Sequence, residues 1–238
     1  MFIKSYTIYK NVGGEKPYAM QPSGKARFLA HTDDYKILTE ILQSGPYLIG
    51  VDGSGSSTGV YFYGVDRETK KKTPMFALNL TRSNNETFVE YRVCFRKIFK
   101  KILTTCKVTR VYYEEPVVDF LNAVPNLYSL RTAIEEILVE EGTNLPVQTK
   151  LFYVANGTWK KWLHVLAGDK APLYPADAKE FARAFYLDMV ELIFDEKEPA
   201  LALDVTDAWG LAFASAPAFV GQDKAIIYES PVTSKLNA

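Results

Sequence analysis

Three stretches of the sequence carry carboxylates of the kind that bind metal ions. Asp52 follows the apolar run YLIGV, and Glu114 and Glu115 end the stretch VTRVYYEE. Asp204 and Asp207 stand three residues apart in DVTD, a spacing that places both on one face of a helix. Carboxylates brought together repel one another unless cations neutralise them, and oxygen ligands suit hard divalent ions. If the fold makes these acids meet, they can hold two such ions, which clamp the attacking and leaving oxygens of a phosphodiester.

Each stretch also has a simpler interpretation. An Asp between an apolar run and the turn GSGSS often only forms the turn, and EEP can end an exposed strand. DVTD can cap the start of a helix, where its acids complement the helix dipole. The glycine-rich turn could also cradle the phosphates of a nucleotide. The joint placement of the acids, at strand ends and on one helix face, favours the metal site.

A series of strands and helices is expected to position these acids. PYLIGVD predicts a strand buried on both faces, and GVYFYGVD and PMFALNL predict two strands that pair with it through hairpins. VTRVYYEEP and LPVQTKLFYV predict two more strands, and helices are predicted over residues 86–104, 126–142, 175–194 and 204–216. This order predicts an α/β fold with a mixed five-stranded sheet flanked by helices. A ligand site in such a sheet lies beyond the carboxyl ends of the strands, where LIGVD and VYYEE end.

The composition is that of an ordinary globular protein. The chain has 238 residues, of which 47% are hydrophobic and 24% charged, and its formal net charge is zero. We expect one domain over residues 46–216, with an N-terminal extension over 1–45 and a C-terminal tail over 217–238. Because we find no apolar run suited to a membrane span and no signal-peptide core, we expect a cytoplasmic protein without a membrane partner. Cys94 and Cys106 lack a metal-binding frame, so we expect reduced thiols.

Basic residues are concentrated in two stretches. Arg92, Arg96 and Lys100, each four residues apart, form a stripe on one predicted helix. Such a stripe can contact DNA or can simply be a solvated helix face. In TWKKWLHVLAGDK, Lys160 and Lys161 stand beside aromatic residues, which suits contact with phosphates and nearby bases.

The other side chains of TWKKWLHVLAGDK have two possible roles. Trp159 and Trp162 could stack on bases, but we expect core positions for both. His164 has no visible partner in the sequence, and we expect a structural role for it, although a histidine beside a nuclease site could assist proton transfer.

From residue 47 to about residue 216 the chain resembles the RuvC family of Holliday-junction endonucleases, which have an RNase H-like fold. GVDGSGSSTGV is similar to the first-strand motif of that family, and YYEEP is similar to its glutamate strand, with Glu114 at the family's glutamate. NAVPNLYSLRTAIEEILVEEGTNLPV follows its helix and next strand, with Arg131 where the family has an arginine. DVTDAWGLA is similar to its closing Asp-x-x-Asp-Ala helix, and NGTWKKW to a segment of its phage members.

The resemblance implies a homodimer that binds four-way DNA junctions in recombination and repair. It implies paired nicks on opposing strands, made with two Mg²⁺ ions, or Mn²⁺, in each active site. The metal ligands carried over by position are Asp52, Glu114, Asp204 and Asp207, with Glu115 as a further possible ligand. The residues carried over for phosphate contact near the scissile bond are Lys160, Lys161 and Lys170.

The chain also departs from the family pattern. Val117 stands where the bacterial proteins have an aromatic residue that helps to open the junction, and Phe120 is the nearest aromatic residue. YSLRTAI replaces the small residues around the helix arginine. Both departures bear on junction recognition and dimer packing. The extensions beyond the matched region, residues 1–45 among them, suggest a bacteriophage member that acts in the cytoplasm of its bacterial host.

Three other functions compete with a junction resolvase. A phosphotransferase of the actin and sugar-kinase type would need a second phosphate loop and an adenosine loop, and we find neither in the sequence. A catalytically inactive DNA-binding module with the same fold is disfavoured by the retained acids, because buried carboxylates without cations are costly. A nuclease of this fold that cuts flaps, forks or other branched DNA is not distinguished by the sequence.

Overall fold

A mixed seven-stranded sheet forms the centre of the computed structural model, which describes residues 5–11, 46–64, 75–82, 84–115, 124–189, 199–215 and 227–236. The strands are β1 (Ser5–Asn11), β2 (Tyr47–Gly53), β3 (Ser57–Gly64), β4 (Met75–Thr81), β5 (Val108–Glu115), β6 (Lys150–Ala155) and β7 (Ile227–Glu229). Their order across the sheet is β1-β4-β3-β2-β5-β6-β7. The five predicted strands lie side by side in the middle, which confirms the mixed α/β sheet. The N-terminal and C-terminal segments each add one edge strand to it.

The strand directions bring two acids to one edge of the sheet. β2, β3 and β4 pair antiparallel, as the hairpin prediction requires, whereas β2 pairs parallel with β5 and β5 pairs parallel with β6. β2 is buried along its first five residues, which confirms a strand covered on both faces. Because the carboxyl ends of parallel strands meet at the same edge, Asp52 and Glu114 end up at one place.

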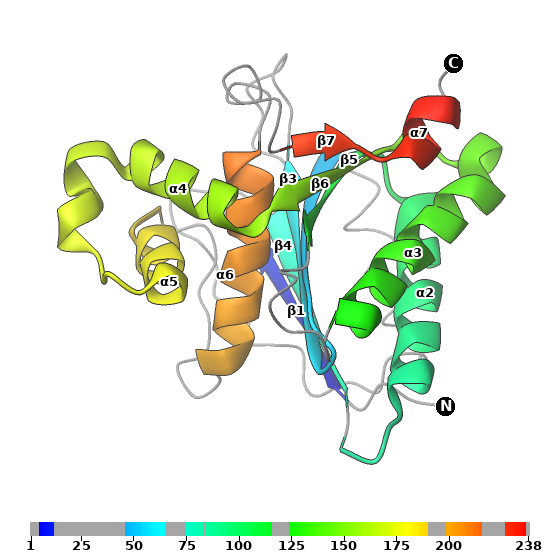
Figure 1. Cartoon of the computed structure of the whole chain (residues 1–238), viewed down its shortest axis with the longest axis horizontal. Helices are drawn as coiled ribbons and strands as arrows, with labels where there is room; N and C mark the ends of the chain where they lie inside the picture. The colour runs from blue at the N-terminus through cyan, green and yellow to red at the C-terminus, as the bar shows by residue number, and fades with distance from the viewer. Residues whose placement is uncertain are drawn as a thin grey trace.

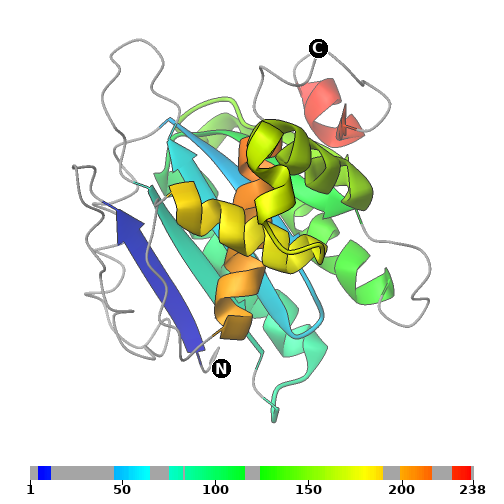
Figure 2. The same cartoon turned by 90° about the vertical axis from the view of Figure 1, so that its left-hand side faces the viewer.

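Helices cover both faces of the sheet (Figure 1). On one face lie α2 (Phe88–Thr105) and α3 (Val124–Glu141), and on the other lies α6 (Pro199–Ala214). α4 (Asn156–Ala167) and α5 (Ala178–Met189) lie outside α6, as Figure 2 shows from that side. Three short helices complete the described chain: η1 (Gly142–Asn144), η2 (Gly168–Leu173) and α7 (Pro231–Leu236). Among the described helices, none is long and apolar enough to cross a membrane.

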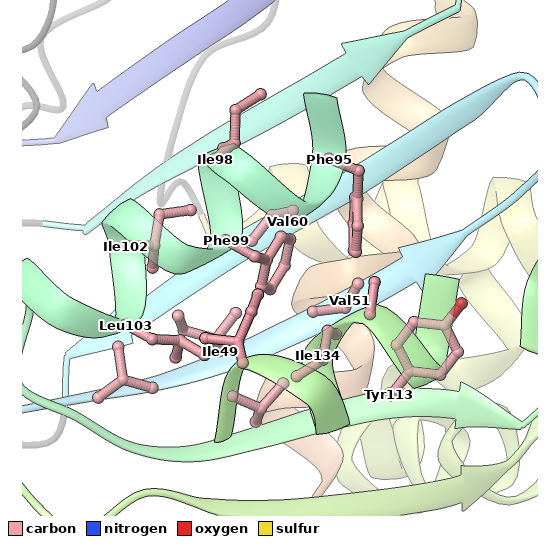
Figure 3. Packing of buried hydrophobic residues seen from close by; sticks show 14 of the residues in the cluster. Ile49, Val51, Val60, Phe95, Ile98, Phe99, Ile102, Leu103, Tyr113 and Ile134 are labelled. Carbon is pink, nitrogen blue, oxygen red and sulfur yellow. The ribbon is translucent and has the colours of Figure 1, made fainter. Parts of the chain in front are cut away.

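The α2 helix follows directly from its sequence. Thr87 and Glu90 form a capping box, in which each side chain accepts a hydrogen bond from the other residue's backbone N–H. Apolar residues then recur at helical spacing, and they are buried against β2 and β3 in the main core (Figure 3). Cys94 and Cys106 are buried free cysteines in and just after this helix. The core therefore fixes β2 from the side opposite to α6.

Two glycines allow α6 to lie directly on the sheet. A Cβ atom at Gly50 of β2 would come within 1.8 Å of the Ala208 carbonyl oxygen, and one at Gly59 of β3 within 2.0 Å of the Asp204 carbonyl oxygen. Any larger residue at either position would push the helix away from the strands. The close approach carries Asp204 and Asp207 toward the end of β2.

We expect that Gly50→Ala lowers the free energy of unfolding by about 1–3 kcal/mol, because the added methyl group must displace α6. Chemical denaturation of the purified protein measures this change. Gly157→Ala is the matched control, because a Cβ there meets nothing within 4 Å and alanine favours a helix by up to about 1 kcal/mol. Equal stability of Gly50→Ala and the unchanged protein would contradict the packing of α6 on β2.

The boundary of α6 corrects one interpretation of its acids. The helix begins at Pro199, more than one turn before Asp204, so DVTD lies inside the helix and does not cap it. The sequence predicts that the helix starts at residue 204, and in the structure it starts five residues earlier, at Pro199. Val117 and Phe120, which bear on junction opening, lie outside the described residues, as do most of residues 1–45.

Candidate active site

Strand register selects Glu114 as the partner of Asp52. Val51 pairs with Tyr113 on the parallel strands β2 and β5, so the next residues, Asp52 and Glu114, lie beside each other. Side chains alternate between the two faces of a strand, and both Val51 and Tyr113 belong to the core under α2 and α3. Asp52 and Glu114 therefore face α6, whereas Glu115 faces the opposite side.

The acids of α6 complete the group. Asp204 and Asp207 lie on the side of α6 that packs on β2 and β3, and Asp207 is 1% exposed. The Ser57 hydroxyl donates to Oδ2 of Asp204 at 2.5 Å, and the Trp159 indole Nε1 donates to Oε1 of Glu114 at 2.9 Å. Neutral donors from β3 and α4 thus hold two of the four carboxylates.

The pKa values of two carboxyl groups show how closely the acids interact. Burial raises the pKa of Asp52 well above its ordinary 3.8, and the charges of Glu114, Asp207 and Asp204 raise it further. Burial also raises the pKa of Asp207 to about 7, although nearby Lys179 and Lys160 act against this. All four predicted acids therefore share one electrostatic site, where at neutral pH one or more carboxyl groups retain protons unless cations neutralise them.

Lys179 of α5 is a functional candidate that the sequence did not single out. Its Nζ lies 3.3 Å from Oδ2 of Asp207 and 4.0 Å from Oδ1 of Asp204. Burial lowers the pKa of Lys179, but the charges of Asp207, Asp52 and Asp204 outweigh burial and raise the pKa above its ordinary value. Lys179 therefore places a stable positive charge at the acids.

Backbone donors of the GSGSS turn are used in hydrogen bonds within the turn itself. The Ser54 N–H donates to the Ser57 carbonyl at 2.7 Å, and the Ser57 N–H donates to Oγ of Ser54 at 2.9 Å. The N–H of Ser56 also points to Oγ of Ser54, at 3.3 Å. Because the turn uses these donors to close its own hairpin, they are not free for a nucleotide. The structure thus favours the metal interpretation of Asp52.

The donor set fits a hard divalent cation. Four carboxylates supply oxygen ligands, and Oδ1 of Asp207 is buried without a hydrogen-bond partner among the described residues. Across the described residues, no three or more Asp, Glu, His or Cys side chains are arranged to hold a metal ion as they stand. Lys179 supplies the positive charge in this arrangement. An ion bound by these acids would have to share that space with Lys179 or displace it.

The basic stripe of α2 is engaged with α3. Arg92 Nη2 lies 2.7 Å from Oε1 of Glu136, and Arg96 Nε lies 3.3 Å from Oε2 of the same residue. Arg96 also pairs with Glu140, and Lys100 with Glu141. The two helices that these ion pairs join, α2 and α3, lie on the sheet face opposite to α6 (Figure 1). The structure therefore gives Arg92, Arg96 and Lys100 a role in joining two helices, away from the candidate site.

The predicted lysines of the α4 region divide into two groups. Lys160 lies close enough to Asp207 to lower its pKa, and its Nζ lies 5.1 Å from the ring centroid of Trp159. Lys161, the next residue on α4, is exposed. Lys170 of η2 instead pairs with Asp188 at 2.9 Å. Lys160 and Lys179, and not Lys170, are thus the lysines that the structure places at the acids.

The aromatic residues of α4 behave largely as the sequence predicts. Trp159 is fully buried, and Trp162 is half-buried and packs against the core under α6. His164 stacks on Phe181 of α5, with ring centroids 3.7 Å apart. That contact joins α4 to α5, as is expected of a histidine with a structural role.

Comparisons with solved structures identify the fold. Thermus thermophilus RuvC in complex with a Holliday junction substrate is 13% identical, with a TM-score of 0.51, 78% of this chain covered and 99% of that chain. A second Thermus thermophilus RuvC structure is 16% identical, with a TM-score of 0.51, and the alignment covers 76% of this chain and 98% of that chain. The yeast mitochondrial Holliday junction resolvase is 10% identical, with a TM-score of 0.48, and the alignment covers 78% of this chain and 85% of that chain.

No family model matches the chain, and no curated protein matches its sequence. The two RuvC structures nevertheless align with this chain over nearly their whole length. The chain therefore has the RNase H-like fold, in the form that RuvC also adopts.

Proposed function

We propose that the protein is a metal-dependent endonuclease that resolves four-way DNA junctions by paired nicks. The observation that carries the proposal is the meeting of Asp52, Glu114, Asp204 and Asp207 at the carboxyl edge of an RNase H-like sheet. The number of these acids and the raised pKa values of Asp52 and Asp207 call for hard divalent cations, Mg²⁺ or Mn²⁺. The fold it shares with RuvC, solved with a Holliday junction substrate, supports that substrate class. The proposal includes a homodimer, because paired nicks on two strands need two active sites.

The residues of the site have different roles in the proposed reaction. Asp52, Glu114, Asp204 and Asp207 would hold the ions. Two bound ions supply activation of a water nucleophile and stabilisation of the leaving oxygen in an in-line displacement. Lys179 and Lys160, both close to Asp207, present ammonium groups to the oxygens of the phosphate that is cut. Lys161, exposed on the same helix, is a candidate for contact with the flanking DNA backbone.

The test is cleavage of labelled DNA by the purified protein. A mobile four-way junction, a flap and a linear duplex of matched length are each incubated with Mg²⁺, with Mn²⁺ and with a chelator. We expect symmetric nicks on two opposing strands of the junction, and we expect none with the chelator. Equal cutting of all three substrates would contradict junction resolution, and preferential cutting of the flap would assign the protein to other branched DNA.

Neutralising substitutions distinguish the two basic regions. Lys160→Gln and Lys161→Gln should each weaken junction binding and reduce the slope of log affinity against log salt by about 1, if each lysine contacts one phosphate. Arg92→Gln with Arg96→Gln should leave that slope unchanged, because both arginines pair with α3. Electrophoretic mobility shifts at several salt concentrations measure these slopes. A reduced slope for the double arginine variant would instead place DNA on α2.

A further inference from the structure

Two neutral donors contact the acids of the site from outside it. Ser57, on β3, donates its hydroxyl to Oδ2 of Asp204 at 2.5 Å. Trp159, at the first turn of α4, donates its indole N–H to Oε1 of Glu114 at 2.9 Å. Resting on the metal site proposed above, we propose that Ser57 and Trp159 are positioning residues that each hold one carboxylate oxygen and direct the other toward the metal ions.

The contact of Ser57 belongs to a short polar chain. Ser57 Oγ also lies 3.0 Å from Oδ1 of Asn79, a fully buried residue of β4. A hydroxyl has one hydrogen, and the carboxylate is both the nearer and the stronger acceptor, so the hydrogen goes to Asp204. Oγ of Ser57 thus lies between the Asp204 carboxylate and the Asn79 side chain, which faces it with Oδ1. The chain fixes Asp204 from the interior of the sheet.

The contact of Trp159 is fixed by packing. The indole is fully buried, and a Cβ at Gly210 of α6 would lie 2.5 Å from its ring. α4 begins directly after β6, so the position of Trp159 is set by the sheet on one side and by α6 on the other. A glutamate side chain otherwise rotates about several bonds, and fixing it costs conformational entropy. The immobile indole reduces the entropy that Glu114 must lose when it binds an ion.

A buried indole N–H needs an acceptor in any case, so Glu114 could merely satisfy Trp159. The two roles differ in what happens to metal affinity when the donor is removed. Loss of an outer partner of a metal ligand weakens metal binding by about 10–100-fold. If the hydrogen bond between Trp159 and Glu114 only satisfies the buried indole N–H or only stabilises the fold, its removal leaves the metal affinity unchanged.

The test is calorimetric titration of the full-length protein with Mn²⁺. Ser57→Ala and Trp159→Phe should each weaken Mn²⁺ binding by about 10–100-fold, and Ser57→Thr, which keeps a hydroxyl, should bind within a fewfold of the unchanged protein. Matched controls are Ser56→Ala, at an exposed serine of the same turn, and Trp162→Phe, on the same helix. Both controls should bind Mn²⁺ as the unchanged protein does.

Thermal melts in chelator separate positioning from folding. Ser57→Ala should melt within a few degrees of the unchanged protein while its Mn²⁺ affinity falls. Wild-type affinity in both Ser57→Ala and Trp159→Phe would overturn the positioning role and leave the nuclease proposal standing. Absence of Mn²⁺ binding by the unchanged protein, with no metal-dependent cleavage, would overturn both proposals.

Discussion

Asp207→Asn should abolish cleavage of four-way junctions while the protein still folds and still binds them. Asp207 is 1% exposed, and its Oδ1 has no hydrogen-bond partner among the described residues, which suits a metal ligand better than a residue that holds the fold. We expect the cleavage rate to fall by about a thousandfold or more, equivalent to about 4 kcal/mol of transition-state stabilisation. Single-turnover cleavage with Mg²⁺ and mobility shifts in chelator measure the two properties separately.

Stability provides the control for this substitution. Asparagine has nearly the same shape as aspartate but carries no charge, so Asp207→Asn removes a buried carboxylate that burial disfavours. In chelator at neutral pH the variant should therefore be at least as stable as the unchanged protein. If Asp207→Asn loses stability and junction binding together, then Asp207 serves the fold, and the proposed role of the acid is wrong.

The strands and the acids could be predicted because both depend on local pattern. β2 is a continuous apolar run whose first polar residue is Asp52, and in β5 the three buried residues Val111–Tyr113 are followed at once by Glu114. The choice between Glu114 and Glu115 could not be made from pattern alone. It depends on which face of β5 meets α6, and that requires the register between β2 and β5.

Lys179 could not be predicted as a residue of the site, because its place there depends on contacts between distant segments. Lys179 is one of many lysines in the sequence, and it meets Asp207 only because α5 packs on α6. The family resemblance implied Lys170, which the structure pairs with Asp188. No local signal distinguishes these two lysines, since both are exposed residues of polar segments.

The partners of the α2 stripe did have a signal in the sequence. Glu136 and Glu140 stand four residues apart on α3, with the same spacing as Arg92 and Arg96 on α2. Two neighbouring helices with complementary charges at this spacing can pair along their length. A basic stripe should therefore be compared with the acidic spacing of the neighbouring helix before DNA contact is inferred.

In the absence of metal, the protein should lose stability as the pH rises from about 4 to about 7. The pKa of Asp207 is about 7 in the folded protein against an ordinary 3.8, so between these values the folded state holds a proton that the unfolded chain has released. The folded state then binds more protons, and the free energy of unfolding falls as the pH rises, on the order of a few kcal/mol across the interval. The raised pKa of Asp52 acts in the same direction.

A divalent cation should reverse this dependence, because it binds the deprotonated carboxylates. Lys100 lowers the pKa of Glu141, and Lys170 lowers the pKa of Asp188. Each of these two carboxylates therefore stabilises the folded state at pH values above its ordinary pKa. Their contribution to the free energy of unfolding is almost the same at about pH 5.5 and at about pH 8, so it does not disturb the comparison. Melting temperatures with chelator and with Mn²⁺ at these two pH values measure the effect. The increase caused by Mn²⁺ should be larger at the higher pH and should be reduced in Asp207→Asn. An increase that is the same at both pH values would mean that the buried acids do not release protons when the metal binds, and the four carboxylates would then not form its site.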